Sequence, residues 1–255
     1  MKKYYSTLIV FLLAAFLLGV GWKDALADGK PQVVIDPGHG GADAGSKDGS
    51  EIEKAWNLKF AQALDKAFEA AGYQVLMTRS SDQAVDPETR LNMINSSTAK
   101  VVLVIHADRE WTRTQTGPFL VVEPPNQTAA TSTTDAIAPL GLITPLEFRS
   151  SLKLAEDIGQ KLGVNISLSD LSDSRGIAGE TGSPYGKVAC LPHQDLRNLS
   201  KPAVVLTPLF LTSASDLKKF SDSAIVDAFA AKVVRGVNSY LQFIPLTPAP
   251  TGTAP

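Results

Sequence analysis

The chain has few residues of the kinds that cross-link a protein or give it a strong charge. It contains a single cysteine, Cys190, so no disulfide can form within it, and the fold must rest on its hydrophobic core. No basic run stands out and the formal net charge is −2, which argues against a nucleic-acid partner. The longest apolar run, Leu8 to Val20, falls short of the roughly 20 residues that a membrane-spanning helix needs.

The N-terminus has the layout of a secretory signal peptide. Lys2 and Lys3 precede the apolar run, and Ala25-Leu26-Ala27 matches a small-x-small cleavage site. We expect residues 1–27 to be removed and the mature chain to act in the periplasm or the extracellular cell wall, without stable membrane insertion. An uncleaved N-terminal anchor is the alternative.

Residues 28–242 alternate short apolar runs with helical patterns, which is typical of a single α/β domain. We expect a largely parallel or mixed sheet of about six strands with helices on both faces, and a ligand site beyond the carboxyl ends of the strands. Residues 124–147 look like a surface insertion, and residues 243–255 like a Pro/Thr-rich disordered tail. The expected strands are 33–35, 73–78, 101–105, 119–122, 188–191 and 203–206, and the expected helices are 53–71, 87–96, 148–162 and 223–241.

Two of the three histidines occupy equivalent positions in this pattern. His39 lies in a glycine-rich loop just past the first expected strand, and His106 directly follows the third. If these strands are neighbours, both imidazoles project at one edge of the sheet. A histidine that closes a strand is often structural, but two at matching strand ends favour a metal pair. His193 is expected to be a loop residue.

A catalytic zinc site uses three protein ligands, and two histidines with a glutamate form a known set. The segment "EIEKAWNL" offers Glu51 and Glu53 at the start of the first expected helix. An acid there can instead be a simple favourable charge at a helix N-terminus. Taken alone, the pattern favours this second interpretation.

Four motifs together resemble the zinc-dependent N-acetylmuramoyl-L-alanine amidases of the cell-wall hydrolase type: "VVIDPGHGGADAG", "EKAWNL", "VIHAD" and "KPAVVL". The resemblance runs from about Gln32 to Leu241. It implies one zinc ion held by His39, Glu53 and His106, since Glu53 rather than Glu51 precedes the motif lysine. It also implies that Asp36 orients the loop from behind the ligands, in the way carboxylates steer metal-bound imidazoles.

The resemblance further implies a substrate and a reaction. The substrate is peptidoglycan, and the reaction is hydrolysis of the amide between N-acetylmuramic acid and L-alanine. A glutamate that does not bind zinc takes the proton of the attacking water. The sequence identifies no activator protein.

The chain departs from the family pattern at that glutamate. The family reads Pro-Ala-Val-Leu-Val-Glu where this chain reads "PAVVLT", so the glutamate position is Thr207. A threonine hydroxyl is no base near neutral pH, and Glu180 and Asp108 are the weak alternative candidates. The sequence therefore leaves two main functions open: an exported zinc amidase, or an impaired amidase-like module that binds peptidoglycan or regulates. A zinc hydrolase with another amide substrate is a third.

Overall fold

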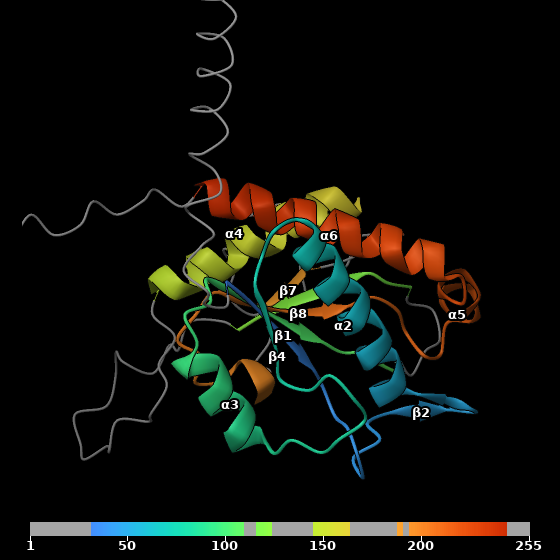
Figure 1. Ribbon diagram of the computed structural model, residues 1–255. Helices are drawn as coiled ribbons and strands as arrows, with labels where there is room; N and C mark the ends of the chain where they lie inside the picture. The colour runs from blue at the N-terminus through green and yellow to red at the C-terminus, as the bar shows by residue number, and fades with distance from the viewer. Residues whose placement is uncertain (1–31, 110–115, 124–144, 164–187, 191–193, 244–255) are drawn as a thin grey trace, which may run out of the picture.

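The centre of the protein is a six-stranded mixed sheet (Figure 1). The computed structural model describes residues 32–109, 116–123, 145–163, 188–190 and 194–243. The strand order is β4-β1-β5-β8-β6-β7. The first four of these strands are mutually parallel, β6 runs antiparallel to β8, and β7 runs parallel to β6. Their bounds are β1 Val33–Pro37, β4 Val75–Met77, β5 Val101–Ile105, β6 Phe119–Val122, β7 Val188–Cys190 and β8 Ala203–Thr207.

Helices cover both faces of this sheet, as predicted. α2 (Glu53–Ala70), α4 (Pro145–Leu162) and α6 (Ser223–Phe243) form the core of one face, and α3 (Pro87–Ser96) with the 3-10 helix η4 (Gln194–Leu196) covers the other. The strands supply both cores because successive side chains point to opposite faces. In β5, for example, Leu103 joins the first core and Val104 the second.

Every expected strand and helix has a counterpart in the structure, with α4 beginning a few residues before the expected start. Sequence reasoning missed the short hairpin of β2 (Lys47–Asp48) and β3 (Glu51–Ile52), and also α5 (Ala214–Phe220). The proposed signal peptide, the tail after Phe243 and residues 124–144 of the expected insertion lie outside the described residues, so these predictions stay predictions. The last three residues of that insertion, 145–147, form the first turn of α4 and not a surface loop.

The sheet order brings the two histidine-bearing strand ends together. β1 and β5 are parallel neighbours, with Pro37 paired to Ile105. His39 and His106 therefore leave the same edge of the sheet, beyond the carboxyl ends of the strands, where α/β sheets commonly bind ligands. In the described residues, no helix is long and apolar enough to cross a membrane.

Candidate metal centre

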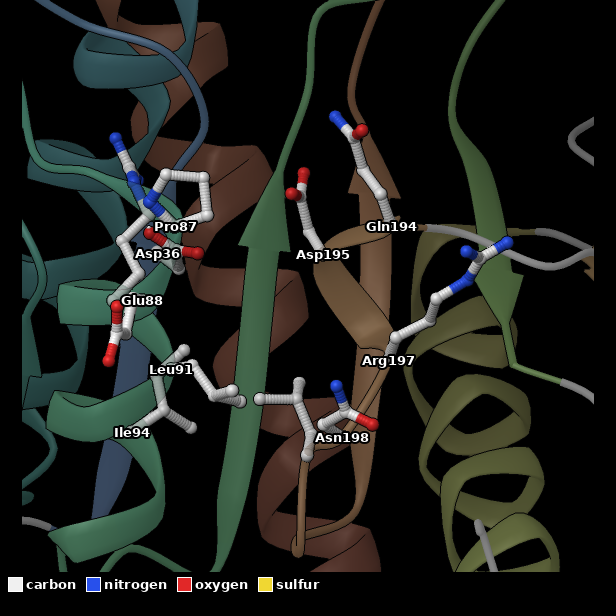
Figure 2. A pocket seen from close by; sticks show the side chains of 11 residues that line it. Asp36, Pro87, Glu88, Leu91, Ile94, Gln194, Asp195, Arg197 and Asn198 are labelled. Carbon is white, nitrogen blue, oxygen red and sulfur yellow. Dashed lines mark hydrogen bonds and ion pairs between the residues drawn. The ribbon is translucent and has the colours of Figure 1, made fainter. Parts of the chain in front are cut away.

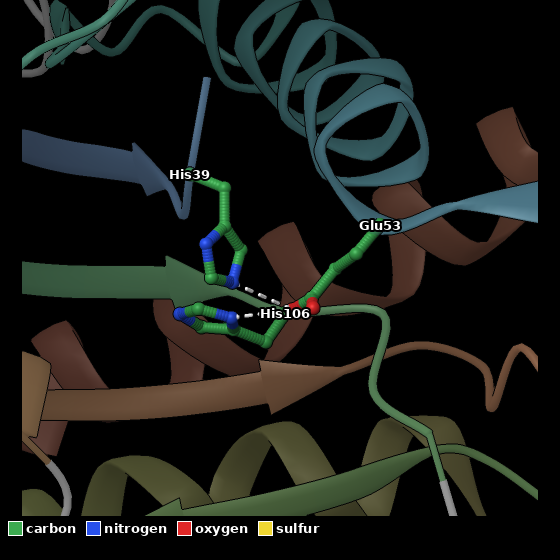
Figure 3. Close-up of side chains that lie close together, drawn as sticks. All are labelled: His39, Glu53 and His106. Carbon is green, nitrogen blue, oxygen red and sulfur yellow. Dashed lines mark hydrogen bonds and ion pairs between the residues drawn. The ribbon is translucent and has the colours of Figure 1, made fainter. Parts of the chain in front are cut away.

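His39, Glu53 and His106 converge on one point at this sheet edge (Figure 3). One ligand atom from each residue lies within 4.8 Å of the others. The Oε1 atom of Glu53 is 3.2 Å from Nε2 of His39 and 2.7 Å from Nδ1 of His106. The two imidazole rings meet edge to face, with centroids 5.0 Å apart. The glutamate begins α2, so three separate segments bring the donors together.

Two glycines leave space for the side chains of the cluster because they have no Cβ atom. A Cβ atom on Gly38 would lie 2.3 Å from the ring of His106, so only glycine lets that imidazole pack over the loop. A Cβ atom on Gly45 would lie 2.5 Å from His39 and 2.6 Å from Glu53. Gly45 also has φ +64°, a conformation that glycine adopts without steric cost.

The three side chains of the cluster form charged pairs in the metal-free protein. Burial alone would raise the pKa of Glu53, but hydrogen bonds with His106 and His39 outweigh it and hold the pKa well below its ordinary value. Burial alone would lower the pKa of His106, but hydrogen bonds with Asp195 and Glu53 raise it to about 10. The hydrogen bond with Glu53 likewise raises the pKa of His39, against the effect of burial. The metal-free site therefore already holds positive charge beside the carboxylate.

Asn57 connects the two histidine segments to α2. This fully buried side chain lies one helical turn after Glu53. Its Nδ2 donates to the carbonyl of Gly38 at 3.1 Å, and its Oδ1 accepts from N–H of Ala107 at 2.6 Å. Sequence reasoning missed it, although a polar residue on the apolar face of the helix was a signal.

Two arginines hold the loop carbonyls behind His39. Arg79 is 1% exposed and donates to the carbonyls of Pro37 and Gly38 at 2.9 and 2.8 Å. Arg90 donates to the carbonyls of Pro37 and His39 at 2.8 and 2.6 Å. These contacts fix the backbone from which the imidazole projects.

Asp36 supports the loop through Arg90 and not through an imidazole. It accepts hydrogen bonds from Arg90, at 2.5 Å, and from the hydroxyl of Thr78. The imidazoles have other carboxylate partners: Asp43 lies 2.8 Å from Nδ1 of His39, and Asp195 lies 2.7 Å from Nε2 of His106. Neither was singled out from the sequence.

The other sequence candidates lie in different surroundings. The carboxylate of Glu51 accepts a hydrogen bond from the indole of Trp56 at 2.7 Å and is outside the cluster. Asp108 is exposed and accepts from N–H of Arg109 at 2.6 Å. Glu180 lies outside the described residues, as does His193.

Thr207 stands beside His106. The paired residues Ile105 and Leu206 precede them on β5 and β8, and His106 N–H donates to the carbonyl of Leu206 at 3.2 Å. By the alternation of the strands, both side chains face the layer of α3. Thr207 is 3% exposed. The residue at the glutamate position thus adjoins the cluster.

Two adjoining pockets open next to the cluster. One, of about 270 Å³, is lined by His39, His106 and Asp43, and the other, of about 210 Å³, runs between α3 and η4 (Figure 2). The pockets share the lining residues Asp36, Pro87, Arg90, Gln194 and Asp195. Together they make a continuous surface that reaches from the candidate metal position past Asp195.

Two histidines and a glutamate at the carboxyl edge of a mixed α/β sheet form a donor set of the kind that metal-dependent hydrolases use. The N-acetylmuramoyl-L-alanine amidase family model matches residues 33–239, and the chain belongs to this family. That match spans β1 to α6 and includes all three clustered residues.

Individual relatives agree with this assignment. N-acetylmuramoyl-L-alanine amidase LytC of Bacillus subtilis is 26% identical over 208 residues, which cover 82% of this chain and 35% of LytC. The germination-specific N-acetylmuramoyl-L-alanine amidase of the same organism is 30% identical over 125 residues, 41% of this chain and 53% of that enzyme. The chain thus spans about a third to a half of the length of these two relatives.

Solved structures show the same fold. The crystal structure of N-acetylmuramoyl-L-alanine amidase from Clostridium difficile is 25% identical, with a TM-score of 0.62, and the match covers 85% of this chain and all of that one. An amidase structure from Nostoc punctiforme is 23% identical, with a TM-score of 0.61, covering 84% of this chain and 98% of that one.

Proposed function

We propose that this protein is an exported, zinc-dependent amidase that cleaves the bond between N-acetylmuramic acid and L-alanine in peptidoglycan. The observation that carries the proposal is the convergence of His39, Glu53 and His106 at one sheet edge of a family member. Export rests on the signal-peptide layout of residues 1–27, and the resulting location is the periplasm or the extracellular cell wall.

The three side chains fit a zinc ion. Imidazole nitrogen and carboxylate oxygen are its ordinary donors, and a catalytic site keeps a fourth position open. The donor separation of 3.2 Å between His39 and Glu53 resembles the roughly 3.3 Å edge of a tetrahedron with ligand bonds near 2.0 Å. A bound zinc ion would polarise the scissile carbonyl and lower the pKa of its water.

The chain itself supplies binding and orientation. Asn57 links the loop of His39 to the segment after His106, and Arg79 and Arg90 fix the loop of His39. The two adjoining pockets beside the cluster offer polar groups from α3 and η4 to a glycan-peptide strand. Thr207 provides no general base next to His106, so we expect the hydrolysis to be slow.

Release of stem peptide from purified sacculi tests this proposal. The wild-type protein, expressed from the full 255-residue chain and loaded with zinc, is expected to release peptide. The His106→Ala variant is expected to bind no zinc and release none. A wild-type protein that neither binds zinc nor cleaves contradicts the proposal.

The Thr207→Glu variant separates the amidase from an impaired binding module, the function that the missing glutamate favours. A carboxylate at this position is expected to raise the rate by about 10²-fold or more, the ordinary contribution of general base catalysis. Thr207→Gln is the matched control, since its amide has the same size and no basicity. If only Thr207→Glu cleaves, and the wild-type protein binds sacculi without cleaving them, the protein is a binding module.

A further inference from the structure

Asp195 lies against the side of His106 that faces away from Glu53. Its Oδ2 atom is 2.7 Å from Nε2 of the imidazole, while Nδ1 of the same ring is 2.7 Å from Oε1 of Glu53. The two ring nitrogens thus have separate carboxylate partners on opposite sides. With both positions engaged, the ring has one orientation and one tautomer available for ligation through Nδ1.

We propose that Asp195 is the positioning residue of the metal centre: it accepts the Nε2–H hydrogen bond of His106 and so holds Nδ1 ready to bind zinc. This inference rests on the proposed function. No motif of the sequence pointed to Asp195, because it stands 89 residues from His106 in the chain.

The surroundings of Asp195 hold it in place. It belongs to η4, whose Leu196 is 1% exposed, and the following Leu199 is 5% exposed; both pack in the core between the sheet and α3. Asn95 of α3 donates to the carbonyl of Asn198 at 2.9 Å. The carboxylate is therefore carried by a packed segment, with its side chain 23% exposed beside the pocket.

The position of Asp195 matters because of Thr207. A glutamate at residue 207 would place an acid beside His106 on the face of the sheet that α3 covers, and this chain has Thr207 at that position. Asp195 brings a carboxylate to that face from η4 instead. Asp43 makes the corresponding contact with His39 at 2.8 Å, so each imidazole has a carboxylate partner apart from Glu53.

A carboxylate behind a metal-bound imidazole raises the basicity of the ligand nitrogen and fixes the ring. Its loss ordinarily weakens metal binding by about 10- to 100-fold. The test is competition with a chelator for Zn²⁺ at constant pH, using the protein expressed from the full chain. Asp195→Asn is expected to weaken zinc binding by about 10-fold or more, and Asp195→Ala by at least as much.

Glu88→Gln is the matched control. Glu88 is exposed and lines the same pocket as Asp195, so its replacement removes the same charge without touching an imidazole. Its zinc affinity is expected to stay within about threefold of wild type, since exposed charges contribute little. Circular dichroism of each variant checks that the fold is intact.

Proton NMR of the zinc-loaded protein gives a readout that a merely structural role would leave unchanged. The Nε2–H proton of His106 is expected to be a slowly exchanging downfield signal in wild type and Glu88→Gln, and to shift or vanish in Asp195→Ala. Equal zinc affinity and equal spectra in the Asp195 and Glu88 variants overturn this inference alone. A wild-type protein that binds no zinc overturns it together with the proposed function.

Discussion

At the scale of single residues, the candidate centre depends on side chains that never touch the metal position. Asn57 bridges the carbonyl of Gly38 and the N–H of Ala107, so it joins the loop of His39 to the segment after His106. Both bonded backbone groups belong to buried residues. An unpaired buried polar group costs about 1–3 kcal/mol, which makes this side chain a sensitive point.

Replacing Asn57 tests this connection. Asn57→Ala leaves Gly38 O and Ala107 N without their partner and is expected to lower the free energy of unfolding by about 2–4 kcal/mol and to weaken zinc binding. Asn57→Asp can still accept from Ala107 but no longer donates to Gly38, so an intermediate loss is expected. Urea unfolding and chelator competition measure the two effects.

Lys66→Ala is the control for that pair, because Lys66 is an exposed residue of the same helix. It is expected to change stability by less than about 0.5 kcal/mol. If Asn57→Ala has the same stability and zinc affinity as the wild type, the bridge contributes nothing.

At the scale of elements, local patterns were enough to predict the sheet and its main helices. Apolar runs such as 101–105 predict buried strands, and the spacing from Leu58 to Phe68 predicts α2. The same logic placed His39 and His106 at neighbouring strand ends, which the structure brings together. The missed α5 did leave a local signal, since Ser213 caps it by accepting from N–H of Asp216 at 3.2 Å.

The partners of the imidazoles could not be predicted in this way. Asp195 reaches His106 only because η4 packs on the sheet beside β8. The spacing of apolar residues in the sequence does not predict such a contact. Asp43 lies four residues from His39, but its contact depends on the loop conformation, in which His39 itself has φ 62°. Long-range packing and backbone conformation, not composition, decide these roles.

The glycine-rich loop permits a matched pair of substitutions. Gly45 and Gly49 have nearly the same φ, +64° and +59°, but a Cβ atom on Gly49 would meet nothing within 4 Å. Gly45→Ala and Gly49→Ala should therefore share a left-handed backbone cost of about 1–2 kcal/mol. Only Gly45→Ala drives a methyl group into His39 and Glu53.

We expect Gly49→Ala to keep wild-type zinc affinity and Gly45→Ala to lose about 10-fold or more, because a ligand must move. Chelator competition on both variants measures this difference. Equal affinities would mean that the loop shifts at no cost and that glycine is unnecessary at residue 45.

At the scale of the whole molecule, metal binding and folding should be linked through His106. Its pKa is raised to about 10, so in the metal-free protein its contribution to stability is fully present below the unfolded value of about 6.5 and is lost as the pH rises through about 10. Zinc must displace this proton, so its binding strengthens as the pH rises. A rise in pH therefore lowers the stability of the metal-free protein and strengthens the binding of zinc.

The increase in Tm caused by zinc is therefore expected to grow between about pH 6 and about pH 8.5. A ligand that binds only the folded state stabilises it in proportion to the logarithm of its concentration over its Kd, and here the Kd falls as protons compete less. The depressed pKa of Glu53 leaves that carboxylate ionised over this pH range, so its titration does not contribute to the pH dependence of the Tm increase.

Thermal unfolding with a chelator and with buffered zinc, at several pH values, measures the increase in Tm caused by zinc. His106→Ala should remove it at every pH, because Nδ1 is gone; a zinc-induced increase that shrinks as the pH rises would show that His106 is not a ligand.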